Sequence, residues 1–344
     1  MESDVIGRIQ AGLECKRENL VHWLESAPEV EKETCLCCED EVDEQEVQAH
    51  LQVIDTALDK AADQTLGVCD VCHGQVEARL LEMDYTASVC LDHYSDEERR
   101  QLENELELSQ VVQRALLPRE TPSIPGVDLA AFSRPAQIVG GDYFDFFRFH
   151  DGAHGLVIAD VEGHGVSSGM LMSSLQTALH TLVPDNDSPV PVLERINRFY
   201  IHNINFTTFV TVFLSRFDPA TRELTYASAG HNPPLLLHLN GGTSASWLNP
   251  TAAAIGLTEE YHVRAETITL SPGDVLLLYT DGVTEATNAE GKPYGADRLA
   301  LAAREHAGLS AQELVRGIRQ SLQAFCGEKP LADDITLLAC KVRG

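Results

Sequence analysis

The chain has 344 residues, 44% of them hydrophobic, which is enough to form two or three folded units with sizeable cores. Its formal net charge is −28, from 25 basic and 53 acidic residues, and such a surface repels phosphate backbones, so a large nucleic-acid interface is excluded. The sequence has no run of about 18 apolar residues, and its start lacks the basic and apolar regions of a signal peptide; we therefore expect a cytoplasmic protein without a membrane span.

Two helical patterns of apolar residues stand near the N-terminus. The first runs from Ile6 to Leu24 and the second from Val47 to Ala61, each with apolar residues three or four positions apart. An acidic, cysteine-bearing segment at about 27–46 separates them. This pattern predicts an antiparallel helical hairpin with a polar tip, and one long bent helix is the alternative.

Seven of the nine cysteines precede residue 91, several of them in ligand-like pairs. Cys69 and Cys72 form one such pair, Cys90 and His93 form another, and 17 residues separate the two pairs. This spacing is close to that of two knuckles that close a tetrahedral zinc site, so metal binding in a reducing compartment is favoured over disulfides. Four nitrogen and sulfur ligands leave no open position, so we expect one structural Zn²⁺; incidental thiols are the alternative.

The segment around these pairs resembles the zinc finger of the DksA/TraR family behind its coiled-coil hairpin, over roughly residues 1–94. The motifs that carry the resemblance are Ala57–Ala61, Gly67–Gly74, Arg79–Leu80 and Cys90–His93. The resemblance implies the zinc site, although His93 stands where the family usually has a cysteine. Members act on RNA polymerase through acidic residues at the hairpin tip, and the residues that stand there are Asp40, Glu41, Asp43 and Glu44. A regulator that binds RNA polymerase is therefore an alternative function.

Three more thiols, Cys35, Cys37 and Cys38, stand at the expected tip, with His50 not far along the chain. They indicate either a second metal or redox site or an acidic loop with incidental thiols. The sequence leaves both readings open.

A connector helix is expected over residues 95–118. Ser95 with the acidic residues after it is typical of a helix start, and Pro118 ends the pattern. Leu102, Leu106, either Val111 or Val112, and Ala115 lie on one side of this helix. Such a stripe packs either on a neighbouring domain or on a second copy, which would give a homodimer.

Beyond residue 126 the sequence changes to short β-branched and aromatic runs, with helical patterns between them. Strands are expected at 127–132, 143–149, 155–161, 208–217, 223–228, 235–239, 263–270, 275–279 and 335–342, and helices at 167–183, 190–203, 296–307 and 310–325. This succession predicts a layered α+β domain. We therefore divide the chain into a regulatory hairpin and zinc finger (1–94), a connector (95–118) and a catalytic domain (119–344).

Four acidic motifs stand at strand ends in this last domain. Their central residues are Asp142, Asp160, Asp281 and Asp333, each with glycine or alanine close by. Divalent cations such as Mg²⁺ and Mn²⁺ prefer oxygen ligands, and a pair of them needs several converging carboxylates. A single Asp-Gly is usually only a turn, but four such motifs at the ends of apolar runs indicate a two-cation site.

From about Gln110 to Val342 the chain resembles the SpoIIE/RsbU branch of the PPM (PP2C-like) phosphatases. Besides the four acidic motifs, the matching segments are Leu116–Pro118, Phe209–Phe213, Ala229–Pro234, Pro272–Asp274 and Leu278–Glu285. The resemblance implies a β-sandwich flanked by helices, with a binuclear Mn²⁺/Mg²⁺ site at one end. It also implies protein serine/threonine phosphatase activity, in which a water activated by both ions attacks phosphorus without a phosphoenzyme.

The resemblance assigns roles to particular residues. Asp142 and Asp160 are implied as ligands, with Asp160 bridging both ions and the carbonyl of Val161 adding another ligand. Asp281 and Asp333 complete the second ion, and Asp334 is the alternative to Asp333.

Several neighbouring residues keep two readings. His164 is either the general acid or a turn residue. Asp145 either orients the metal ligands without binding the ions itself or has no part in the site. His231 and Asn232 either line the site or, as we favour, fix the turn that follows them.

By analogy with the same branch, the substrate is a phosphorylated STAS-type anti-sigma-factor antagonist, and the N-terminal zinc module controls the enzyme through the connector. A low-activity scaffold that binds this partner is the alternative. The activating signal and the choice between Mn²⁺ and Mg²⁺ stay open.

Overall fold

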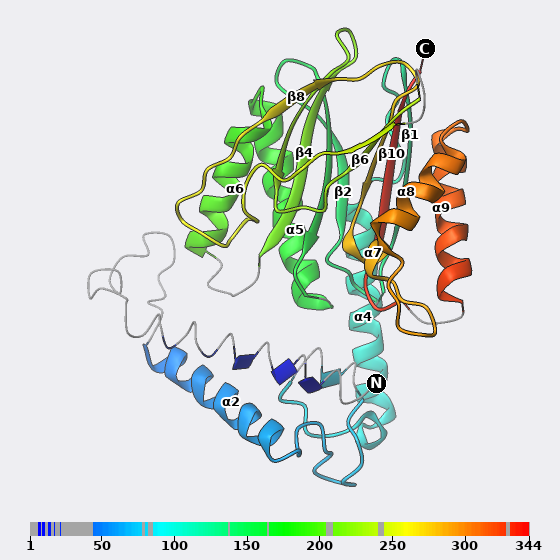
Figure 1. Ribbon diagram of the computed structural model, residues 1–344. Helices are drawn as coiled ribbons and strands as arrows, with labels where there is room; N and C mark the ends of the chain where they lie inside the picture. Colours follow the sequence, from blue (N-terminus) through cyan, green and yellow to red (C-terminus); the bar gives the residue numbers. More distant parts are fainter. Residues whose placement is uncertain are drawn as a thin grey trace. The chain divides into compact units, whose positions relative to one another are not determined.

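The computed structural model describes residues 44–77, 80–81, 85–136, 138–163, 165–203, 209–239, 244–327 and 331–343, with positions 6, 7, 9, 10, 13, 14, 17 and 21. The chain divides into two compact units, residues 1–104 and 105–344 (Figure 1). None of the described helices is long and apolar enough to cross a bilayer.

The N-terminal unit is built around α2 (Glu44–Ala62). Ile54, Ala57 and Ala61 lie on one face of this helix, three or four residues apart, and pack with Leu13 and Leu66. The described residues between 6 and 21 are helical, as the sequence predicts. The predicted hairpin tip lies outside the described residues.

A second, smaller core follows α2. It contains Cys69, Val76, Leu81 and Cys90. Cys90 directly precedes the short helix η2 (Leu91–His93). Four buried side chains are few for a stable core, which is why a metal ion is expected to join this segment.

The connector forms α4 (Asp96–Leu116), close to its predicted bounds. The division between the two units falls within this helix. Leu108, Val111 and Val112 are exposed on its C-terminal half, between 52% and 63%.

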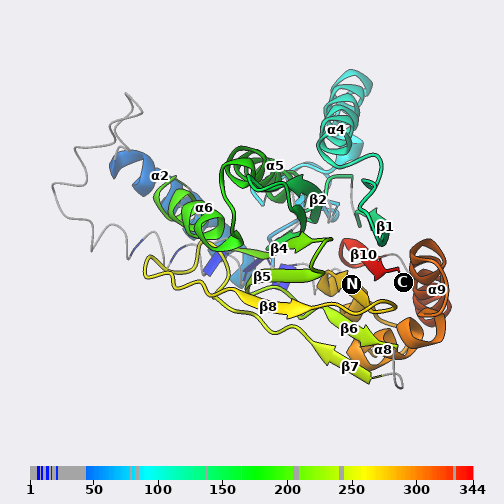
Figure 2. The same ribbon diagram turned by 90° about the horizontal axis from the view of Figure 1, so that it is seen from above.

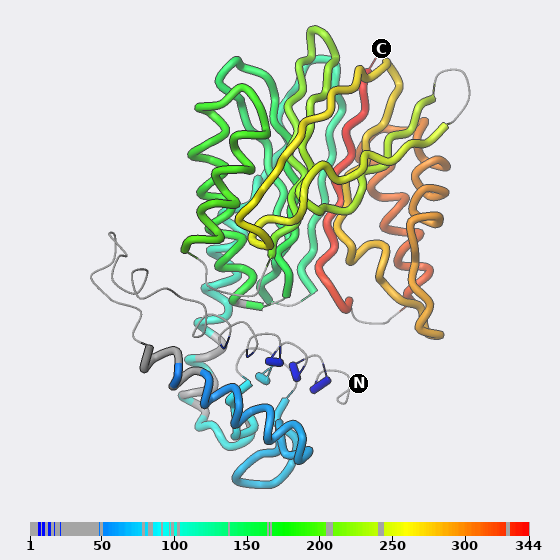
Figure 3. Tube along the Cα trace, turned by 60° about the vertical axis from the view of Figure 1, so that its left-hand side comes forward, coloured from blue at the N-terminus to red at the C-terminus, as the bar shows by residue number. Residues whose placement is uncertain are grey.

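The C-terminal unit contains two five-stranded antiparallel sheets. The first has the order β1 (Val127–Arg134), β10 (Ile335–Val342), β9 (Val275–Tyr279), β6 (Leu235–His238) and β7 (Ser244–Trp247). The second has the order β2 (Tyr143–Arg148), β3 (His154–Val161), β4 (Val210–Asp218), β5 (Glu223–Ala229) and β8 (Glu266–Thr269). The last strand, red in Figure 3, lies inside the first sheet beside β1, so the two ends of this unit pair.

Helices cover the outer face of each sheet (Figure 2). The second sheet packs on α5 (Val166–Leu182), which continues as η3 (Val183–Asp185), and on α6 (Pro189–Asn203). The first sheet packs on α7 (Asp281–Glu285), α8 (Gly295–His306) and α9 (Ala311–Cys326). The result is the predicted α+β sandwich of four layers.

Central strands are apolar on both faces because both faces are covered. In β3, Leu156 and Ile158 face the inter-sheet core, whereas Val157, Ala159 and Val161 pack toward α5 and α6. Near-continuous apolar runs in the sequence therefore correspond to these strands.

Most predicted bounds agree with the structure to within two residues, and three differences stand out. Strand β7 was not predicted, because it carries two serines among four residues. Helix α7 has only five residues, too few for a periodic pattern. The strand expected at 263–270 shortens to β8, the edge of its sheet.

Candidate active site

The predicted carboxylates of the second sheet lie at one end of it. Asp142 directly precedes β2, and Asp160 is the next-to-last residue of β3. These strands are antiparallel, with Tyr143 opposite Ala159, so the start of one lies beside the end of the other.

The first sheet repeats this arrangement. Asp281 begins α7 just after β9, and Asp333 and Asp334 precede β10. Because Tyr279 pairs with Leu337, these carboxylates also meet at one end of their sheet.

Hydrogen bonds connect the two sets across the sandwich. The Oδ2 atom of the buried Asp142 accepts from Thr280 Oγ1 at 2.8 Å and from Thr336 Oγ1 at 2.6 Å. Thr336 lies on β10 of the opposite sheet and Thr280 directly follows its strand β9, so both fix Asp142 relative to Asp281 and Asp333. Sequence reasoning missed them, although each stands inside an acidic motif.

Asp334 has a different environment from Asp333. Its carboxylate accepts backbone N–H bonds from Ala136 at 2.7 Å, Gly141 at 2.6 Å and Asp142 at 3.4 Å. A Cβ atom at Gly140 would overlap this carboxylate, so the loop before β2 wraps closely around it. Asp334 therefore holds the loop in place.

Asp333 is exposed, and its Oδ1 atom accepts only the N–H of the next residue among the described contacts, at 2.8 Å. Its other oxygen is available for a cation. The geometry thus favours Asp333 over its neighbour as a ligand, while its role remains a prediction.

Negative charge is concentrated around Asp160. Burial raises the pKa of Asp160 to about 8, and the charges of Asp281 and Asp333 act in the same direction. Burial also raises the pKa of Asp142 well above its usual range, with Asp160 as the largest electrostatic contribution.

The pKa values of Asp281 and Asp333 are raised as well. Burial raises the pKa of Asp281, even though the N–H of Gly282 and the carboxyl of Asp160 both donate to it. Although Asp333 is exposed, partial desolvation by the surrounding protein raises its pKa to about 6, and the charge of Asp281 reinforces this. These hard oxygen donors suit divalent cations, whose charge would offset the repulsion.

The carbonyl of Val161 lies beside the loop that carries Asp142. A Cβ atom on Gly141 would be 2.7 Å from this oxygen, so only glycine permits the close approach. His164, either the general acid or a turn residue by the sequence, lies outside the described residues.

The connector helix also holds this loop. The side chain of Gln113 donates to the carbonyl of Gly140 and accepts its N–H at 3.0 Å, and Gln110 donates to the carbonyl of Ile138 at 3.2 Å. Gly169 on α5 leaves room for the loop, because a Cβ atom there would overlap Val139. This contact could not be predicted, because glutamines in a helix carry no motif.

Asp145 belongs to a separate hydrogen-bond cluster. Its Oδ2 atom accepts from the Tyr143 hydroxyl at 2.7 Å and lies 2.8 Å from His180 Nε2, while Oδ1 accepts the N–H of Phe146 at 2.7 Å. Both oxygens are thus occupied, and Oδ2 connects β2 with His180 of α5. This favours a structural role over a part in the cofactor site.

His231 lies behind the site. Its Nδ1 atom is 2.9 Å from Thr211 Oγ1, and Thr211 is the register partner of Asp160. Burial lowers the pKa of His231 to about 4, so the imidazole is neutral at pH 7. It therefore supports β4 and is not a cation at the site; for Asn232 both readings stay open.

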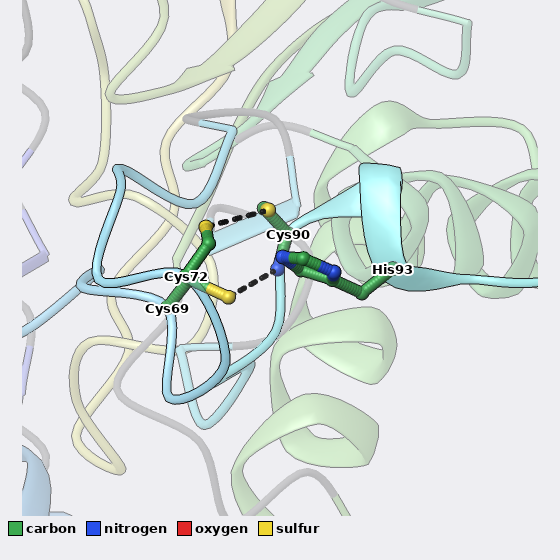
Figure 4. A group of neighbouring side chains, drawn as sticks. All are labelled: Cys69, Cys72, Cys90 and His93. Carbon is green, nitrogen blue, oxygen red and sulfur yellow. Dashed lines mark hydrogen bonds between the residues drawn. The ribbon is translucent and has the colours of Figure 1, made fainter.

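The four predicted zinc ligands converge in the N-terminal unit (Figure 4). One ligand atom each from Cys69, Cys72, Cys90 and His93 lies within 4.8 Å of the others, and the Sγ atoms of Cys72 and Cys90 are 3.7 Å apart. Burial raises the pKa of Cys69, but N–H donors led by Cys72 outweigh this and lower it to about 6. These donors and distances fit a tetrahedral Zn²⁺. The thiols predicted at the hairpin tip, Cys35, Cys37 and Cys38, lie outside the described residues.

Comparison with known proteins identifies the catalytic unit. The family model of Stage II sporulation protein E (SpoIIE) matches residues 150–343, more than half of the chain. This chain belongs to the SpoIIE family.

Two curated proteins of Bacillus subtilis (strain 168) are similar to it. Phosphoserine phosphatase RsbU is 30% identical over 243 residues, which cover 71% of each chain, and phosphoserine phosphatase RsbP is 28% identical over 188 residues, which cover 53% of this chain and 46% of RsbP.

Solved structures share the fold of this SpoIIE-family unit. The SiaA-PP2C domain of Pseudomonas aeruginosa superposes with a TM-score of 0.62 at 23% identity, covering 72% of this chain and 98% of that domain. The RsbU and RsbW domains of Rv1364c from Mycobacterium tuberculosis give 0.55 at 33% identity, covering 64% and 61%. The predicted PP2C-like fold and the enzyme class, a protein serine/threonine phosphatase, are confirmed.

Proposed function

We propose that this SpoIIE-family enzyme hydrolyses phosphoserine or phosphothreonine on a protein partner with two Mn²⁺ or Mg²⁺ ions. Asp142, Asp160, Asp281 and Asp333, with the carbonyl of Val161, would hold the ions. The supporting observation is the cluster of mutually repelling carboxyls at one end of the sandwich, with raised pKa values and a hard-oxygen donor set.

The positions of the carboxyls support a bridging role for Asp160. Its charge acts on Asp142 of the same sheet, and it in turn responds to Asp281 and Asp333 of the other sheet. It is thus the carboxyl that both sets share. When bound, the ions would lower the pKa of a water and offset charge on the phosphoryl oxygens.

Other residues position these ligands. Thr280 and Thr336 hold Asp142 in place, and Asp334 holds the loop before it. For His164 both roles stay open, either proton donor to the leaving oxygen or turn residue.

We further propose a STAS-type anti-sigma-factor antagonist as the substrate and control by the N-terminal unit through α4. RsbU and RsbP are named phosphoserine phosphatases, and Rv1364c carries RsbU and RsbW domains in one protein. The bonds of Gln113 to Gly140 give α4 a direct connection to the loop before Asp142. The exposed Leu108, Val111 and Val112 would form the interface of a homodimer.

A phosphatase assay tests the catalytic proposal. We expect the full chain to hydrolyse p-nitrophenyl phosphate and a phosphoserine peptide with Mn²⁺ and not with EDTA. Asp160→Asn should lower the rate about a hundredfold or more, because a shared ligand of both ions is lost. Asp185→Asn, at an exposed aspartate of η3, is the control and should keep full activity.

Two results would contradict this proposal. One is an activity of Asp160→Asn equal to that of the wild type. The other is absence of activity with Mn²⁺ and with Mg²⁺, which would favour the low-activity scaffold. The RNA-polymerase alternative depends on the acidic tip, of which Asp40, Glu41 and Asp43 lie outside the described part of the chain, so no observed contact supports it.

A further inference from the structure

A groove of about 300 Å³ lies between the end of β1 and helix α9. Three arginines line it: Arg134 at the last position of β1, and Arg316 and Arg319 one turn apart on α9. All three are exposed. In a chain with a net charge of −28, such a concentration of positive charge needs a reason.

No carboxylate in the described part of the chain forms an ion pair with these guanidinium groups. The nearest acidic neighbour in sequence, Glu313, accepts from the backbone N–H and hydroxyl of Ser310 in the N-terminal cap of α9. The charge of Arg316 contributes less than these bonds to lowering the pKa of Glu313. The guanidinium of Arg319 lies over the Phe132 ring, with its central carbon 3.6 Å from the ring centroid. A stacked guanidinium keeps its N–H donors in its own plane, ready for an incoming carboxylate.

Apolar side chains also line the groove. They are Phe132, Leu331 and Ile335, with Leu322 from α9, and they stand beside Gln320 and Gln323. We call these four apolar side chains the apolar floor. Arginines around an apolar floor suit a partner segment that has acidic residues next to an apolar anchor.

The groove adjoins the candidate active site through a shared segment. Leu331 lies two residues before Asp333, and Ile335 lies two residues after it. Arg134 is the register partner of Ile335. A segment bound in the groove would therefore lie close to a phosphoryl group at the carboxylates.

We propose that this groove binds an acidic segment with one apolar anchor on the phosphoprotein substrate and so selects the substrate. This inference rests on the proposed phosphatase function. Elsewhere the acidic surface repels such a segment, whereas here guanidinium groups attract it and the apolar floor accepts the anchor.

Direct binding is the first measurement. The probe is a fluorescent, unphosphorylated peptide with four acidic residues around one leucine, followed by anisotropy with the full chain at low salt. We expect saturable binding that weakens about tenfold or more in Arg316→Glu/Arg319→Glu and weakens with added salt. A peptide with Gln and Asn in place of the acidic residues should not bind.

The matched control is Arg195→Glu/Arg264→Glu. It changes the net charge equally, at exposed arginines on α6 and just before β8, both belonging to the second-sheet side. The control should bind the peptide as the wild type does. Equal loss in both double variants, or no binding by the wild type, would overturn the groove proposal.

Selectivity is the second measurement. A phosphoserine peptide is compared with the same peptide extended by the acidic segment, using Mn²⁺. We expect the ratio of kcat/KM values, extended over plain, to be about ten in the wild type and the control, arising in KM, and to fall to about one in the groove variant. A ratio unchanged in the groove variant would overturn the inference.

Together, the binding and selectivity measurements distinguish failure of the groove proposal from failure of the phosphatase proposal. If the enzyme hydrolyses neither peptide, the phosphatase proposal fails and the anisotropy result alone decides the groove. If hydrolysis occurs without binding or selectivity, the phosphatase proposal stands and the groove proposal is wrong.

Discussion

Asp333 and Asp334 are neighbours in the chain, but backbone N–H groups surround only one of them. The three N–H bonds to Asp334 stabilise its carboxylate and occupy it, whereas Asp333 turns an oxygen outward. Adjacent identical residues thus divide two tasks: one orders the loop and the other is available to a cation.

Gly282 is a sensitive position beside this pair. A Cβ atom there would overlap the backbone carbonyl of Asp334, so Gly282→Ala must shift either α7 or the start of β10. We expect a loss of about 1–3 kcal/mol in the free energy of unfolding and at least about a tenfold loss of activity. Denaturant unfolding and the Mn²⁺-dependent assay measure both. Gly308→Ala is the control, because a Cβ atom there meets nothing within 4 Å; comparable losses in both variants would refute the steric account.

His231 makes stability depend on pH. Its pKa is about 4 in the folded chain and near 6.5 when unfolded, so protons bind preferentially to the unfolded chain below about pH 6.5. Stability should therefore fall as the pH is lowered through this window, by about 2 kcal/mol between pH 7 and pH 5.

Urea unfolding of His231→Gln and of the wild type at both pH values measures this contribution. The variant should lose about 2 kcal/mol less on acidification, and His262→Gln, at an exposed histidine, should behave as the wild type. Equal losses in wild type and His231→Gln would show that the histidine does not carry the effect.

The candidate site was partly predictable from the sequence. Asp142, Asp160 and Asp281 stand at the ends of apolar runs with small neighbours, and these local features survive in the structure. Thr280 and Gln113 were not predictable, because each acts through a contact with a distant segment. Only the packing of two sheets and a helix creates their roles.

At the scale of single elements, α9 depends on its first turn. Ser310 accepts the N–H of Glu313 at 3.3 Å, and Glu313 accepts the N–H of Ser310 at 3.0 Å, which completes a capping box. Ser310→Ala should lower the free energy of unfolding by about 1 kcal/mol, and Ser310→Thr by only a few tenths. Thermal unfolding monitored by circular dichroism measures the difference, and equal losses would mean that the cap contributes nothing.

Strand bounds were predictable where chemistry changes abruptly. The strands β9 and β10 begin and end as predicted, because Asp274 precedes one apolar run and the Asp333–Asp334 pair precedes the other. In contrast, β7 forms only because β6 offers it an edge. Its own sequence does not distinguish it from a loop.

At the scale of the whole molecule, the two units should respond differently to metal removal. The small core around Cys69 and Cys90 needs the proposed zinc, whereas the sandwich has large cores of its own. Metal analysis should find about one zinc per chain, and a zinc-selective chelator should expose the N-terminal unit to protease while residues 105–344 stay resistant.

Variants sharpen this prediction. Cys72→Ser should lose the zinc and become protease-sensitive without chelator, whereas Cys326→Ser should retain the zinc. A wild-type preparation without zinc that resists protease would contradict the structural role.

The hydrogen bonds from Thr280 and Thr336 to Asp142 have a consequence for the evolution of the enzyme. Because of these bonds, the distance between the predicted metal ligands of the two sheets depends on how the sheets pack on each other. Side chains of the inter-sheet core, such as Leu278 and Leu338, determine that packing. We therefore expect substitutions in this layer to alter the catalytic rate without contacting substrate or cation. On this account, selection for turnover would act on the interior of the sandwich as well as on its rim.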